Sequence, residues 1–141
     1  YNFAVTHFKK ALSFKPDSIS IKFNLAESLK EMGEYSVATK ILNEIICKKS
    51  NYIFAYLALG EIQCSSGNFS KGFSNFQKAI DMNLKQDFLF SLLAFYSNYS
   101  PDMSSEEIFK YYKLYDQKLG LPHKHKWKPF AQPKVAKNKC C

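Results

Sequence analysis

Apolar residues recur every three or four positions along most of this chain, which is the spacing of one face of an α-helix. Residues that end helices separate the periodic segments. Pro16 and Pro101 cannot continue a helix, and Gly33 and Gly67 stand where two helices turn back on themselves. The pattern therefore predicts an all-α protein, with helices at residues 1–14, 20–32, 35–48, 53–65, 69–82, 87–97 and 105–119.

The same period predicts which residues face the core in two of these helices. In the first helix they are Phe3, Ala4, Phe8, Ala11 and Leu12, and in the helix 35–48 they are Val37, Ala38, Ile41, Leu42 and Ile45.

A longer period of 34 residues runs across the helices. Seven columns match in size and polarity at this offset: Tyr1, Tyr35 and Phe69; Ala4, Ala38 and Gly72; Phe8, Leu42 and Phe76; Ala11, Ile45 and Ala79; Leu25, Leu59 and Leu93; Ala26, Gly60 and Ala94; Gly33 and Gly67. Self-similarity at this period is typical of a right-handed solenoid of two-helix units, in which neighbouring units share one core. Small residues in two of the columns are expected to let the helices of a unit approach closely.

The repeat divides the chain into units. We expect a half repeat at residues 1–18, full repeats at 19–52 and 53–86, and a partial repeat at 87–97. Tyr1 falls at the start of the second helix of a unit, so the sequence is expected to be a fragment of a longer protein.

After residue 97 the register is lost. Pro101 ends the helix, and Ser104 with Glu107 forms a capping-box pattern for a new helix. We expect residues 98–120 to be a linker and a capping helix. Residues 121–141 have no apolar period and are expected to form a disordered basic tail, with Trp127 and Phe130 as its only anchors.

Composition sets limits on the class of protein. Among the 141 residues, 46% are apolar, which is enough for a continuous core, but no run approaches the roughly 20 apolar residues that span a bilayer. The four Cys do not form a disulfide framework, so we expect a reducing, cytoplasmic location. Abundant Lys, Asn, Phe and Ile without Arg is typical of an AT-rich genome, such as a bacterial one.

The net charge of +8 belongs to the end of the chain. Residues 118–141 carry seven Lys and no acid, whereas residues 1–117 carry 13 Lys against 12 acids. Lys lacks the planar fork with which Arg reads phosphate or guanine. We therefore do not expect nucleic acid to be the partner, and a binder of anionic surfaces through the Lys tail is the weakest of three functional hypotheses.

The repeat resembles a known family. The string NLAESLKEMGEYSVA, with Leu25, Ala26, Gly33, Tyr35 and Ala38, is similar to a tetratricopeptide repeat. A second copy, LALGEIQCSSGNFSKG, matches through Leu59, Gly60, Gly67, Phe69 and Gly72. The resemblance covers about residues 1–97 and implies a module that binds proteins or extended peptides.

The junction carries a second resemblance. Asn98-Tyr99-Ser100-Pro101-Asp102 and the following Ser104–Phe109 are similar to the segment before the catalytic domain in bacterial relatives of O-linked N-acetylglucosaminyltransferase, the SPINDLY-like group. In that family two nucleotide-sugar-binding Rossmann lobes follow. No strand and Gly-rich turn follow Lys118 in this sequence, so we expect no enzymatic activity from this chain.

In such a stack the first helices of the units line a concave groove. The expected groove positions are Ser20, Phe23, Asn24, Glu27, Lys30, Glu31, Phe54, Leu57, Ala58, Glu61, Cys64 and Ser65. The transferase resemblance implies that Asn24 bonds a peptide backbone. The three Glu make the groove acidic, with Lys30 as the exception, which favours basic or neutral ligands. Ordinary solvated helix faces are the alternative interpretation.

Other candidate chemistry does not reach the strength of a motif. His123 and His125 with Cys140 and Cys141 match no closed zinc site. The terminal Cys pair resembles a prenylated end only through those two residues. No catalytic residues, metal or cofactor are expected.

Two functions remain open from the sequence. One is the substrate- or partner-recruiting arm of an O-GlcNAc-transferase-like glycosyltransferase. The alternative is a stand-alone scaffold or adaptor with no enzymatic domain.

Overall fold

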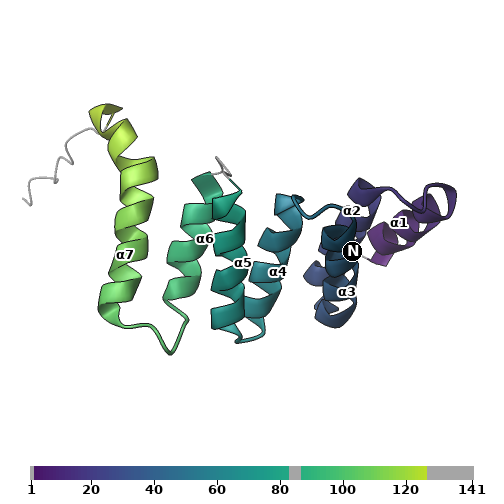
Figure 1. Ribbon diagram of the computed structural model, residues 1–141, viewed down its shortest axis with the longest axis horizontal. Coiled ribbons are helices and arrows are strands. Elements are labelled where there is room, and N and C mark those ends of the chain that lie inside the picture. The colour runs from purple at the N-terminus through teal and green to yellow at the C-terminus, as the bar shows by residue number, and fades with distance from the viewer. Residues whose placement is uncertain (1, 83–86, 127–141) are drawn as a thin grey trace, which may run out of the picture.

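A computed structural model describes residues 2–82 and 87–126, and these residues fold into a row of antiparallel helices without a strand (Figure 1). The α-helices are α1 (Asn2–Phe14), α2 (Ile19–Glu31), α3 (Tyr35–Lys48), α4 (Ile53–Ser65), α5 (Phe69–Asp81), α6 (Asp87–Ser97) and α7 (Ser105–Tyr115). They follow one another along the long axis of the molecule, so that each helix packs mainly against its neighbours in sequence. None of the described helices is long and apolar enough to cross a membrane.

The turns between paired helices explain why the predicted helix ends agree with the structure to within one residue for α2 to α6. Gly33 and Gly67 both have φ of 79°, the left-handed region that glycine adopts without steric cost. The N–H of Gly33 donates to the carbonyl of Lys30 at 2.9 Å, and that of Glu34 to the carbonyl of Leu29 at 2.9 Å. The same two bonds recur around Gly67. Both turns are Schellman motifs, which cap a helix and reverse the chain.

The core is divided into two clusters that meet at α4. The first is formed by Val5, Leu25, Ala26, Leu29, Ala38, Leu42, Ile45, Ala55, Ala58, Leu59 and Ile62 from α1 to α4. The second is formed by Leu57, Cys64, Phe76, Ala79, Leu89 and Leu93 from α4 to α6, with Tyr111 of α7 packed against it. Helix α4 is therefore buried on two sides, as expected for a helix in the middle of a solenoid.

Two predicted core residues are exposed. Phe3 leaves 77% of its surface exposed because α1 is the first helix of the row and α2 alone covers it. Val37 is 44% exposed, although Ala38, Leu42 and Ile45 of the same helix are fully buried. The buried face of this helix is narrower than the apolar face that its sequence predicts. Val37 lies at the edge of the apolar face, outside the buried part.

The end of the described chain differs from the prediction. The capping box at Ser104 is present, but α7 ends at Tyr115, and a π-helical turn covers Asp116–Gly120. Leu121–Lys126 then form a 3-10 helix where an irregular tail was expected. The predicted anchors Trp127 and Phe130, and the terminal Cys140 and Cys141, lie outside the described residues.

Candidate functional site

A cleft of about 280 Å³ opens on the side of the row where α2, α4 and α6 lie. Its lining is formed by Phe23, Glu27, Lys30, Phe54, Leu57, Ala58, Glu61 and Phe88. Phe23, Glu27 and Lys30 follow the i, i+4, i+7 spacing that places residues on one helix face, and Phe54, Ala58 and Glu61 repeat it on α4. Helix α6 contributes Phe88 to the lining of the cleft. The cleft thus joins three helices that are each the first of a unit.

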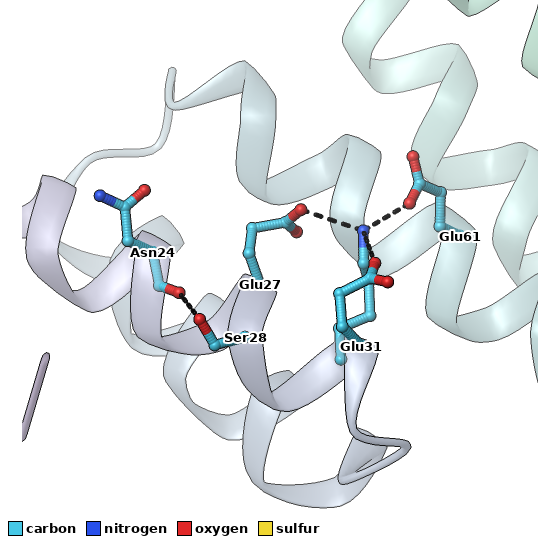
Figure 2. A network of polar contacts seen from close by, with 6 residues as sticks. Asn24, Glu27, Ser28, Glu31 and Glu61 are labelled. Carbon is cyan, nitrogen blue, oxygen red and sulfur yellow. Dashed lines mark hydrogen bonds and ion pairs between the residues drawn. The ribbon is translucent and has the colours of Figure 1, made fainter. Parts of the chain in front are cut away.

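At one side of the cleft the ammonium of Lys30 lies among three carboxylates (Figure 2). Its Nζ is 2.6 Å from an oxygen of Glu61, 3.1 Å from one of Glu27 and 3.9 Å from one of Glu31. Because Glu61 is on α4 and Lys30 is on α2, the short bond joins neighbouring units. One positive charge against three negative charges leaves the cluster with a formal charge of −2.

The environment of Lys30 keeps it protonated. The side chain is only 12% exposed. Burial lowers the pKa of the Lys30 ammonium, but hydrogen bonds and charge from Glu61 and Glu27 more than offset this, so the pKa lies above its ordinary value. The positive charge in the cluster is therefore permanent at neutral pH.

Glu27 has an oxygen without a partner. Its Oε2 accepts from Lys30, whereas Oε1 is shielded from solvent and accepts no hydrogen bond from the described residues. A buried acceptor left without a donor costs about 1–3 kcal/mol, more when it is charged. Glu27 therefore carries one buried acceptor without a donor among the described residues.

Aromatic rings also line the cleft. The Phe23 ring centroid is 6.1 Å from that of Phe54 and 5.5 Å from that of Tyr52. Phe54 and Phe88 remain 42% and 44% exposed, and they are one repeat length apart in the sequence. Large apolar side chains that stay exposed together mark a surface available to a partner.

Five of the predicted site residues meet in the cleft, and three do not. Glu27, Lys30, Phe54, Ala58 and Glu61 line it, together with Phe23 and Leu57, which were expected at groove positions as well.

The other three lie outside the lining. The carbonyl of Asn24 accepts from the hydroxyl of Ser28 at 2.9 Å, and Asn24 itself is exposed (Figure 2). Glu31 contacts the cluster only through Lys30 at 3.9 Å. Ser65 lines a separate, mainly aromatic hollow of about 410 Å³, formed with Cys64, Gly67, Phe69, Phe95, Tyr96 and Tyr99. A binding role for all eight residues stays a prediction.

Sequence reasoning missed Phe88. It falls in the partial repeat, 34 residues after Phe54, and extending that column by one period would have found it. It also treated Lys30 as an exception to an acidic surface, whereas the structure places Lys30 at the centre of the charge cluster.

The described residues give little support to metal binding or to nucleophilic catalysis. Within residues 2–82 and 87–126, no group of three or more His, Cys, Asp or Glu is placed to hold a metal ion. Burial, together with the charge of Glu61, raises the pKa of the Cys64 thiol to about 11. That thiol stays protonated at neutral pH and is a poor nucleophile.

Neither a family model nor a curated protein matches this chain. Among solved structures, it is similar to the crystal structure of MamA, a protein with tetratricopeptide repeats. The TM-score is 0.70 at 22% sequence identity, over 94% of this chain and 70% of the MamA chain. This chain has the tetratricopeptide-repeat fold. This similarity confirms the predicted α-solenoid. A sequence identity of 22% supports a shared fold and nothing more specific.

The tetratricopeptide-repeat fold gives the cleft its place in the architecture. In the predicted division into units, α2, α4 and α6 are the first helices of their units. The exposed rings and the charge cluster lie on the side of the row that these helices form, and a role of this side as the concave binding face stays a prediction.

Proposed function

We propose that this chain is a protein-protein interaction module that binds an extended segment of a partner protein along the face formed by α2, α4 and α6. The observation that carries the proposal is the cleft itself, which three successive units line with exposed Phe54 and Phe88 and with a cluster of net charge −2. A surface built from side chains of several repeats suits a long, narrow ligand, because each unit adds contacts along it.

Selection from a random peptide library, followed by calorimetric titration of the selected peptides, tests this proposal. Binding is expected to weaken on Asn24→Ala and to be lost on Glu27→Lys, and to persist when residues 121–141 are removed. Glu44→Lys provides a matched charge reversal, since Glu44 lies on α3 and pairs with Lys22 rather than with the cleft. Failure to select any peptide would contradict the proposed function.

A finer version concerns the whole protein. We propose that the module recruits substrates or partners for a glycosyltransferase similar to the O-linked N-acetylglucosaminyltransferases. The likeness of residues 98–109 to the linker of that group supports this version. Rossmann-type strand, Gly-rich turn and helix units in the reading frame after Cys141 are the expected result. Unrelated sequence there would favour the alternative, a stand-alone scaffold.

The cellular location is part of the same proposal. Cys47 and Cys64 are free thiols, which are typical of a reducing compartment such as the cytoplasm. Fluorescence microscopy of the tagged full-length protein would check this expectation.

A further inference from the structure

We propose that the cleft between α2, α4 and α6 receives the cationic side chain of a Lys or Arg from the extended partner segment. In this arrangement the aliphatic stem lies against Phe54 and Phe88, and the charged head lies next to Glu27 and Glu61. The inference rests on the proposed function and specifies the chemistry of its ligand.

The net charge of the cluster determines whether a positively or a negatively charged ligand would bind there. Among the described residues, the three carboxylates of Glu27, Glu31 and Glu61 pair with a single ammonium, that of Lys30, so two of their negative charges have no counter-charge there. An acidic or C-terminal carboxylate would add to this excess and would be repelled. A cationic head would reduce it, and partial burial of the cluster makes the interaction stronger than it would be in open water.

Hydrogen bonding favours a donor over a purely apolar head. Oε1 of Glu27 accepts no hydrogen bond from the described residues. Lys and Arg heads carry donors and no acceptors, so either one would match this oxygen once the Glu27 side chain turns it toward the ligand. A hydrocarbon side chain in the same place would leave that oxygen unsatisfied.

The aromatic side of the cleft matches the rest of such a side chain. Lys and Arg lay their methylene stems along apolar surface while the charge stays near polar groups. Rings also attract a cation over their faces. Exposed Phe54 and Phe88 provide apolar surface in the same cleft as Glu27 and Glu61.

The size of the cleft fits one side chain. Pockets for small molecules are usually about 300–1,000 Å³, and this cleft holds about 280 Å³. The cleft therefore has room for one long side chain of a partner segment.

The occupant is assigned to a partner protein. The chain has its own Lys-rich region at residues 118–141, and the described part of it follows α7. Helix α7 stands at one end of the row, α2 lies toward the other end, and α4 lies between them (Figure 1). None of the described basic residues that follow α7 is among the residues that line the cleft.

The experiment uses the full chain and peptides selected from the random library. Selected peptides should share a Lys or Arg at one position. Replacing that residue with norleucine, which keeps a Lys-like stem without the charge, should weaken binding about tenfold. Glu at the same position should abolish binding.

A double-mutant cycle separates direct contact from a structural effect of the carboxylates. In the Glu27→Gln variant the norleucine substitution should cost clearly less than the tenfold expected in the wild type, because one of the two carboxylates next to the cationic head is already neutralised. In the Glu44→Gln control, which neutralises an ion-paired Glu on α3, the full loss should remain. If circular dichroism shows that Glu27→Gln has lost helicity, the same double-mutant cycle is run with Glu61→Gln instead.

The outcomes have distinct meanings. Selected peptides without a shared basic residue, or equal costs of norleucine in wild type and Glu27→Gln, would overturn the cationic ligand while leaving peptide binding in place. No selected peptide at all would overturn the proposed function first. A synthetic peptide of residues 118–141 is the last test. If it binds as tightly as the selected peptides, with the same sensitivity to Glu27→Gln, then the chain's own basic region, and not a partner protein, is the ligand of the cleft.

Discussion

At the scale of single residues, two glycines set how closely α4 and α5 pack. A Cβ added at Gly60 would overlap the ring of Phe76, which is fully buried. A Cβ added at Gly72 would overlap the sulfur of Cys64 and would come within 3.0 Å of the carbonyl oxygen of Gly60. Neither neighbour is the free end of an exposed side chain, so neither can move aside cheaply.

Gly60→Ala should therefore destabilise the protein, although alanine is the better helix former by about 1 kcal/mol. Overpacking a filled core costs about 1–3 kcal/mol, which outweighs that gain. Urea unfolding followed by circular dichroism measures the change. Ser74→Ala, on the exposed face of α5, is the control and should alter stability by less than about 0.5 kcal/mol. A stabilised Gly60→Ala variant would show that propensity, not packing, decides this position.

The site residues show what the sequence predicts about a surface and what it does not. The repeat register placed Glu27 and Glu61 in one column and Phe54 in another, so their common face was predictable. The hydrogen bond from Lys30 on α2 to Glu61 on α4 was not, because it depends on the rise and rotation between units, which periodicity does not determine. The exposure of Val37 was not predictable either, because it depends on how much of α3 the neighbouring helices cover.

At the scale of elements, the turn glycines should be sensitive to backbone conformation alone. At Gly33 and Gly67 a Cβ would meet no atom within 4 Å, yet φ is 79° at both. Gly33→Ala or Gly67→Ala should each cost about 1–2 kcal/mol, the penalty of the left-handed region for a residue with a Cβ. Gly→Asn should cost less at both sites, since Asn tolerates that region. Thermal unfolding of the four variants tests this ranking, and equal costs for Ala and Asn would contradict it.

These turns also explain why the helices were easier to predict than the end of the chain. A positive-φ glycine and a Schellman motif stop a helix at a defined residue. After α7 no such signal intervenes until Gly120, and the chain passes from α-helix through a π-helical turn into a 3-10 helix. The local sequence there is compatible with several helical forms, so its pattern did not distinguish them.

The first turn of α7 should be sensitive to acid. The backbone N–H and the hydroxyl of Ser104 donate to Glu107, at 2.8 and 2.9 Å, and lower the pKa of that carboxyl from its ordinary value. A carboxyl with a depressed folded pKa stabilises the fold above its unfolded pKa, and this contribution is lost as the pH falls through the folded value.

As the pH falls below the ordinary pKa of a Glu carboxyl and through the depressed pKa of Glu107, the N-terminus of α7 is therefore expected to fray. Cα chemical shifts of residues 105–108 between pH 7 and pH 3 measure this change. In Glu107→Gln the amide keeps the capping-box acceptor without titrating, so the acid-dependent fraying should be smaller. Identical pH profiles in wild type and Glu107→Gln would rule out the capping box as the cause.

At the scale of the whole molecule, stability should be local. Solenoid units contact only their neighbours, and the two core clusters share no helix other than α4. Leu42 lies fully buried in the first cluster, and Phe76 lies fully buried in the second. A cavity at either position should therefore open one half of the row more than the other.

Leu42→Ala should cost about 2–5 kcal/mol, the usual range for a buried Leu. Hydrogen exchange under native conditions, read by mass spectrometry, should accelerate in α1 to α3 and remain close to wild type in α6 and α7. Phe76→Leu should give the mirror image, with faster exchange in α5 and α6 and little change in α1 and α2. A uniform acceleration along all helices in both variants would mean that the row unfolds as one cooperative unit, and that α4 transmits the loss of packing rather than confining it.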